Sequence, residues 1–220
     1  MPDDGPDAVT STDRRLDLAT RNAHKVVELA EILADVLAQV RLELVGMDVF
    51  PEVADVVEDG ASFAANALLK ARAVAAATGL PALADDSGLS VDILGGSPGI
   101  FSARWSGRAD LTGTAKDRAN LDLLLAQLAD VRDEHRGAGF VCAAALVLPD
   151  GTARVREGHF RGTLTRSPRG DNGFGYDPIL LVEGDTRTSA ELSPAEKNAI
   201  SHRGKAFRAL AGDLRELLGP

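Results

Sequence analysis

The chain has 220 residues, of which 45% are hydrophobic and 26% charged, and its formal net charge is −9. This length suits one large domain, and no apolar run is long enough to span a membrane. The acidic balance excludes general nucleic-acid binding, which needs a basic surface, whereas one small anion needs only a few local cations.

The N-terminal segment and the cysteine content give two further predictions. Residues 1–14 are polar and acidic, unlike a signal or transit peptide, so we expect a disordered tail followed by one domain at 15–220. Cys142 is the only cysteine and lies in an apolar stretch, which excludes an internal disulfide. This pattern predicts a buried thiol and a reducing, cytoplasmic location.

The first predicted unit is a strand, a turn and a helix. Residues 15–19 read as a strand, Thr20 to Asn22 turn the chain, and apolar residues then recur at helical spacing over 26–37. A helix N-terminus carries unpaired N–H groups and partial positive charge, so this turn together with Lys25 suits a phosphate. The alternative is that Asn22 only caps the helix and Lys25 is solvated.

A possible second strand at 41–45 precedes a long Ala-rich helix at 62–78. Asn66 and Lys70 lie four residues apart on one face of this helix. A lysine on a helix usually faces solvent, but this helix leads directly into the next strand. Glu58, in the acidic loop before the helix, supplies another carboxylate, although such loops are commonly only solvated.

Two adjacent carboxylates, Asp85 and Asp86, follow the buried strand predicted at 81–84. Neighbours in a strand point to opposite faces, so we expect these two side chains to have different roles. Carboxylates beside a turn suit Mg²⁺, which takes one or two of them and leaves its other positions to water and phosphate. The alternative is an acidic turn in which an aspartate caps a helix or begins a bend.

The second half of the chain combines helices with a predicted hairpin. Residues 114–130 have the pattern of an amphipathic helix, and 140–148 with 152–160 that of a β-hairpin. A hairpin among helix-linked strands favours a mixed sheet. Ser193 begins a capping box, and the last amphipathic helix follows, with its apolar face at residues 206–217.

Two groups of side chains in this half suit a nucleotide. Phe174 is bracketed by glycines in a loop, where an exposed ring is suited to stacking on a base; the alternative places the ring in the core. Lys197, His202 and Arg203 gather donors near a helix start, which suits a base carbonyl, a sugar or a phosphate. The alternative is the solvated end of a surface helix.

Taken together and in order, these segments resemble the noncanonical purine nucleoside triphosphate pyrophosphatases, also called inosine/xanthosine triphosphate pyrophosphatases. The resemblance spans about Leu16 to Leu218. The matching motifs are Leu18-Ala19-Thr20-Arg21-Asn22 with Lys25, Asn66-Ala67 with Lys70-Ala71, Ala84-Asp85-Asp86-Ser87-Gly88-Leu89, Gly95-Gly96-Ser97-Pro98-Gly99-Ile100, Gly173-Phe174-Gly175-Tyr176-Asp177-Pro178, and Ser193-Pro194 with Ser201-His202-Arg203-Gly204.

The resemblance implies a fold and an activity. The fold would be α/β, with a two-lobed mixed β-sheet, flanking helices and an active-site cleft between the lobes. The activity would be Mg²⁺-dependent hydrolysis of ITP, dITP and XTP to the monophosphate and pyrophosphate, carried out by a homodimer.

The resemblance also implies the site residues. Asp86 would be the general base and, with Glu58, a metal ligand, while Lys70 would be catalytic near the phosphates. The substrate-binding residues would be Thr20, Arg21, Asn22, Ala23, His24, Lys25, Ser87, Phe174, Gly175, Tyr176, Asp177, Lys197, His202 and Arg203. One position departs from the family pattern: Ala65 stands where a glutamate is common. If that glutamate binds metal, another carboxylate such as Asp85 has to replace it.

Other function classes fit part of the pattern. A pyrophosphatase for other modified nucleotides would keep the chemistry with a different pocket. A non-catalytic nucleotide-binding module would lose the metal site, and the presence of both Asp86 and Lys25 argues against it. A serine hydrolase built on Ser87 is not expected, because no GxSxG motif surrounds that residue.

Overall fold

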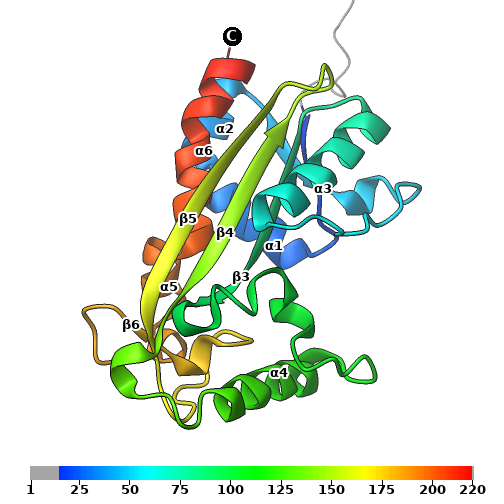
Figure 1. Ribbon diagram of the computed structural model, residues 1–220. Helices are drawn as coiled ribbons and strands as arrows, with labels where there is room; N and C mark the ends of the chain where they lie inside the picture. The colour runs from blue at the N-terminus through cyan, green and yellow to red at the C-terminus, as the bar shows by residue number, and fades with distance from the viewer. Residues whose placement is uncertain (1–14, 220) are drawn as a thin grey trace, which may run out of the picture.

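The computed structural model describes residues 15–219, so the tail predicted at 1–14 lies outside the described residues. A six-stranded sheet in the order β2-β1-β3-β4-β5-β6 forms the centre of the fold (Figure 1). The first three strands in this order are parallel. β4 then pairs with β3, β5 with β4 and β6 with β5, each time antiparallel. The mixed sheet expected from the hairpin is therefore confirmed. The strands are β1 (Arg15–Leu18), β2 (Glu43–Gly46), β3 (Ala82–Val91), β4 (Gly137–Val147), β5 (Ala153–Leu164) and β6 (Leu180–Val182).

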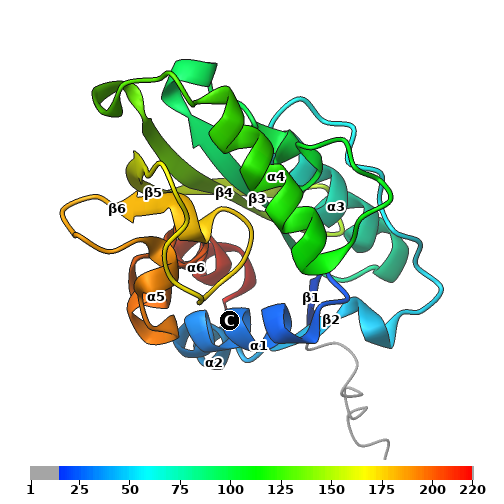
Figure 2. The same cartoon turned by 90° about the horizontal axis from the view of Figure 1, so that it is seen from below.

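Helices cover both faces of this sheet. Figure 2, seen from below, shows α1 (Ala23–Ile32), α2 (Ala34–Val40) and α6 (His202–Leu218) on one side and α3 (Phe63–Thr78) on the other. Large aliphatic and aromatic side chains fill the core on the α6 side. The core on the α3 side consists mostly of alanines from α3, β3 and β4, so the helix can lie close to the strands.

The long strands β3, β4 and β5 extend into a second lobe (Figure 1). There α4 (Gly113–Gln127) and β6 pack on a separate apolar cluster. The two lobes therefore share one sheet, as the resemblance implied. The remaining short elements are α5 (Pro194–Ile200) and the 3-10 turns η2 (Met47–Val49), η3 (Asp92–Leu94), η4 (Gly99–Arg104), η5 (Asp133–His135), η6 (Asp177–Ile179) and η7 (Ser189–Glu191).

Local capping signals define both ends of α3 and the start of α5. Ser62 accepts a hydrogen bond from the Ala65 N–H at the start of α3, and Gly79 ends that helix with a left-handed backbone at φ 69°. Ser193 forms the predicted capping box of α5 with Glu196. These predicted boundaries are confirmed. No helix within residues 15–219 is long and apolar enough to cross a membrane.

Several other boundaries differ from the predictions. The first predicted helix is interrupted at Leu33, which leaves helical geometry at φ −99° and ψ 4° and separates α1 from α2. The strand expected from residue 41 begins at Glu43, because Arg41 takes a left-handed backbone (φ 55°) that closes α2. The predicted turn after Asp86 is wrong. Each residue from Asp85 to Gly88 pairs with β4, so β3 continues as one strand to Val91.

Candidate active site

Asp85 and Asp86 lie in the middle of β3, just beyond the point where the neighbouring strand β1 ends. β1 pairs with β3 only through Asp17 with Ala82 and Leu18 with Leu83, and the chain then turns into α1. Beyond Leu83, this edge of β3 faces the start of α1 rather than a strand. The carboxylates therefore occupy a crevice at the carboxyl end of β1, the position where open α/β sheets bind ligands.

Two cavities open near this crevice, and neighbouring residues of α1 line them. His24 lines a cavity of about 580 Å³, and Lys25 lines a second one of about 310 Å³. We call the first the aromatic cavity; its walls include Ser87, Phe140, Phe174, Tyr176, Asp177, Lys197, His202 and Arg203. We call the second the lysine cavity; its walls include Thr20, Arg21, Lys25, Glu58 and Lys70.

Asp86 points to the α3 face of the sheet and is half-buried there. Its carboxylate accepts hydrogen bonds from Asn66 Nδ2 and from the Ser87 N–H, both at 3.0 Å. Lys70 Nζ lies 3.9 Å from Asp86 and 2.7 Å from Glu58, so this lysine faces carboxylates rather than solvent. Burial raises the pKa of Asp86 and the nearby Glu58 adds to the shift, although Asn66 and Lys70 oppose it. A raised pKa favours proton uptake by this carboxylate.

Glu58 lines the lysine cavity, and Asp86 reaches it through Lys70, whose Nζ lies 2.7 Å from Glu58 and 3.9 Å from Asp86. Both are hard donors on either side of Lys70, which suits a cation that shares its coordination with phosphate and water. Within residues 15–219, no group of three or more His, Cys, Asp or Glu side chains is placed to hold a metal ion. Asp85, the carboxylate suggested to take the place of the glutamate at Ala65, has its two oxygens paired with Lys25 and Arg203.

The turn before α1 is partly occupied by its own hydrogen bonds. Asn22 is an N-cap, and its side chain accepts from the N–H groups of His24 and Lys25. Arg21 donates to the carbonyls of Met47 and Val53 and pairs with the exposed Asp55. Arg21 therefore fastens the following loop as well as lining the lysine cavity. Ala23 is exposed and lines neither of the two cavities.

The glycine-flanked loop presents an exposed ring to the aromatic cavity. Phe174 is 68% exposed, which excludes the alternative that it belongs to the core, and Lys197 Nζ lies 5.5 Å from its ring centroid. Asp177 accepts from the Phe174 N–H, Ser189 Oγ and Lys197 Nζ. The Tyr176 hydroxyl donates to the Ser102 carbonyl. Asp177 and Tyr176 thus support the loop that carries Phe174.

His202 forms part of the wall of the aromatic cavity. Its ring stacks on Phe140, with centroids 5.1 Å apart and an angle of 21°. Its Nδ1 atom is buried without a hydrogen-bond partner among the described residues. Burial lowers the pKa of His202 to about 3, and the neighbouring Arg203 and Lys197 act in the same direction. A neutral imidazole offers one donor and one acceptor to a base.

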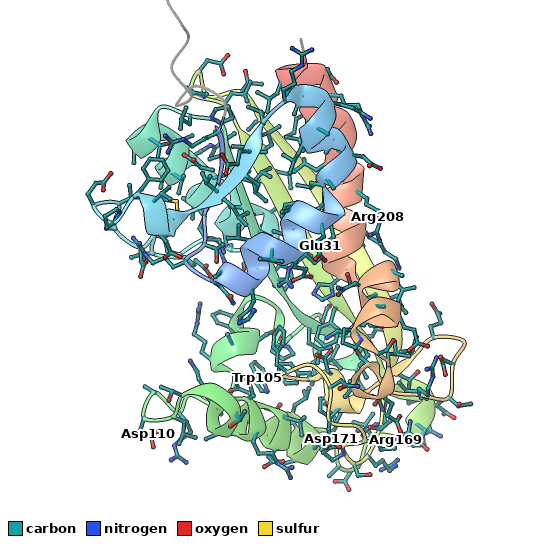
Figure 3. All side chains as sticks on the ribbon, turned by 180° about the vertical axis from the view of Figure 1, so that it is seen from behind. Glu31, Trp105, Asp110, Arg169, Asp171 and Arg208 are labelled. Carbon is teal, nitrogen blue, oxygen red and sulfur yellow. The ribbon has the colours of Figure 1, made fainter. Side chains whose placement is uncertain are left out.

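The structure adds site residues that the sequence reading did not select. Glu28 binds Arg203 at 3.1 Å, and its spacing of one helical turn from Lys25 was an available signal. Asp117 of α4 accepts from the Gly175 N–H at 3.3 Å, a contact within the second lobe between residues 58 positions apart, for which the sequence has no local signal. Trp105 lies beside α4 and donates to Gln127, so it is part of the second lobe rather than of the site (Figure 3).

Fold and site together define an α/β protein that handles nucleotides: an aromatic cavity suited to a base adjoins a lysine cavity suited to phosphates. The chain belongs to the Ham1 family, whose model matches residues 16–213. A dITP/XTP pyrophosphatase of Streptomyces avermitilis is 67% identical over 205 residues, which cover 93% of this chain and 99% of that protein.

Solved structures agree with this assignment. A HAM1 protein from Coxiella burnetii superposes with a TM-score of 0.82 at 41% identity, covering 92% of this chain and 98% of that one. A nucleoside-triphosphatase / dITP/XTP pyrophosphatase from Mycobacterium abscessus has a TM-score of 0.75 at 51% identity, covering 91% and 98%. The family and the fold class implied by the sequence motifs are thereby confirmed.

Proposed function

We propose that this protein hydrolyses noncanonical purine nucleoside triphosphates, namely dITP, ITP and XTP, to the monophosphate and pyrophosphate. The observation that carries the proposal is a pair of neighbouring cavities, which the adjacent residues His24 and Lys25 line. The lysine cavity adjoins Asp86, Glu58 and Lys70, and the aromatic cavity carries Phe174 and Arg203. Relatives named dITP/XTP pyrophosphatases that match most of this chain support the substrate class.

The phosphate end of the reaction belongs to Asp86 and the two lysines. The Asp86 carboxylate, held by Asn66 and by the Ser87 N–H, would orient the attacking water and take its proton. Lys25 and Lys70 would offset the charge that develops as the bond between the α and β phosphates breaks. Mg²⁺ held by Asp86 and Glu58 would supply further charge neutralisation on the phosphate oxygens.

The base end determines which purine is accepted. Hypoxanthine and xanthine carry a carbonyl where adenine carries an amino group, and Arg203 and His202, which line the aromatic cavity, would donate to that carbonyl. Adenine would face the same donors with an amino group, a mismatch that discriminates strongly in a site shielded from water. Phe174 would stack on the base whichever purine is bound.

The organisation of the active protein is also a proposal. We propose that residues 15–220 act as one catalytic domain in the cytoplasm, as a homodimer without membrane or nucleic-acid partners. The buried Cys142 thiol is compatible with a reducing compartment. Analytical ultracentrifugation measures the oligomeric state, and a sedimentation coefficient of a monomer would contradict the dimer.

Product analysis tests the function. With Mg²⁺, we expect ITP to yield IMP and pyrophosphate, and ATP to react at least about 100-fold more slowly. Chelation of divalent ions should stop turnover. Release of inorganic phosphate with inosine diphosphate would contradict the proposed cleavage point.

Asp86→Asn should lower kcat by about 100-fold or more, because the amide cannot take a proton. The matched control is Asp92→Asn, a half-exposed aspartate on the 3-10 turn after β3 that pairs with Arg161. This control should keep the activity of the parent protein. An Asp86→Asn variant with normal turnover would remove the assigned base.

A further inference from the structure

Asp85 is a buried carboxylate that connects the two cavities. Its side chain is only 2% exposed and points to the face of β3 opposite to Asp86. Oδ1 lies 2.5 Å from Lys25 Nζ, on the wall of the lysine cavity. Oδ2 accepts from Arg203 Nε at 3.3 Å, on the wall of the aromatic cavity. One aspartate thus holds a cation from each end of the site.

Glu28 closes these contacts into a ring. Arg203 Nη1 lies 3.1 Å from Glu28, which is on α1 with Lys25. The ring therefore passes from α1 through β3 to α6 and returns to α1. Burial acts to raise the pKa of Asp85, but Lys25 and Arg203 outweigh it and hold the pKa below its usual range. Each of the two Asp85 oxygens is therefore paired with a cation of the chain itself.

We propose that Asp85 is a positioning residue that couples recognition of the purine to the binding of the phosphates. It would fix the direction of the Arg203 guanidinium and the place of Lys25 together. A donor discriminates a carbonyl from an amino group only while its direction is fixed, and a charge-assisted bond to a buried carboxylate provides that restraint. This inference rests on the proposed function, because it assigns the two ends of the site to base and phosphates.

The first test replaces the carboxylate by its isosteric amide. Nucleotide affinities are measured by calorimetry with divalent ions chelated, so that no turnover is needed. Asp85→Asn should lower the preference for ITP over ATP about 10-fold or more, since a charge-assisted bond is lost at Arg203. The matched control is Asp213→Asn, because Asp213 is another buried aspartate, paired with Arg156 at 2.8 Å, and lies outside both cavities. It should keep the parent preference.

The second test keeps Asp85 and asks whether a change at the phosphate end of the site alters the choice of purine. Lys25 lines the lysine cavity, yet Lys25→Met should lower the ITP-to-ATP affinity ratio about 3-fold or more, because the ring then holds Arg203 less firmly. Lys70→Met removes the other lysine of that cavity, which pairs with Glu58 outside the ring. Lys70→Met should weaken the binding of ITP and of ATP by the same factor. If Asp85 had only a structural role, the affinity ratios of Lys25→Met and Lys70→Met would not differ.

The outcomes separate the two proposals. If the parent protein shows no preference for ITP over ATP, the proposed function fails before any variant is compared. If the preference exists but a folded Asp85→Asn keeps it within about 2-fold, the positioning role is wrong. If Asp85→Asn does not fold, the lysine variants test the proposal instead. An ITP-to-ATP affinity ratio that is the same in Lys25→Met and Lys70→Met would overturn the coupling.

Discussion

At the scale of single residues, the site shows how burial changes the chemistry of ordinary side chains. Neighbouring aspartates on one strand differ because one face of the sheet offers two cations and the other offers an amide and a lysine. Asp85 is held charged, whereas burial raises the pKa of Asp86. Strand alternation predicted that their roles differ, but the partners that make them differ are distant in sequence.

His202 gives a pH-dependent prediction. Its folded-state pKa of about 3 lies below the ordinary value of 6.5, so below pH 6.5 the unfolded chain binds a proton that the folded chain does not. Stability is therefore lost as the pH falls from 6.5 toward 3, and no contribution arises above 6.5.

His202→Phe keeps an aromatic ring against Phe140 and cannot titrate. Between pH 7.5 and pH 5, we expect the parent protein to lose about 2 kcal/mol more unfolding free energy than this variant. Urea unfolding at the two pH values measures the difference. Parallel losses in both proteins would show that the imidazole is not held neutral.

At the scale of elements, the loop around Phe174 depends on glycine for two separate reasons. Gly173 has a left-handed backbone at φ 78°, and a Cβ there would overlap the Asp177 carboxylate and lie 3.0 Å from Lys197 Nζ. Gly184, between β6 and η7, has the same kind of backbone at φ 79° but open space around it. Substitutions at these two positions therefore distinguish the effect of backbone strain from the effect of disturbing the Phe174 loop.

Both alanine variants should lose roughly 1–2 kcal/mol of unfolding free energy from backbone strain. Only Gly173→Ala should also weaken IMP binding, by about 10-fold, because it displaces the Asp177–Lys197 pair that supports Phe174. Calorimetry with IMP and thermal unfolding measure the two effects. Equal IMP affinity in both variants would mean that the pair does not position the ring.

At the scale of the whole molecule, two lobes share one sheet, and Arg136 joins the parts of the second lobe. This arginine is 1% exposed and donates to the carbonyls of Leu128, Leu164 and Thr165. These carbonyls come from segments after α4 and at the end of β5. The side chain therefore supports the wall that α4 contributes to the aromatic cavity.

Arg136→Met should cost roughly 3–5 kcal/mol of unfolding free energy, because it leaves buried carbonyls without donors. Arg166 also binds carbonyls of this lobe, at Ala129 and Val131, but its side chain is 54% exposed. Arg166→Met should cost less than about 1 kcal/mol, since water replaces the lost contacts. Chemical denaturation compares the two. Equally small losses of unfolding free energy in both variants would show that Arg136 does not stabilise the second lobe.

Features that depend on a few neighbouring residues could be predicted from the chain alone. Capping residues such as Ser62 and Ser193 set helix starts, apolar periodicity located the helices and the hairpin, and ordered motifs pointed to the family. The continuation of β3 through Asp86 could not be predicted in this way, because it depends on pairing with the distant strand β4. The same holds for the partner of Asp85, since Arg203 lies 118 positions away and reaches the carboxylate only after α6 packs on the sheet.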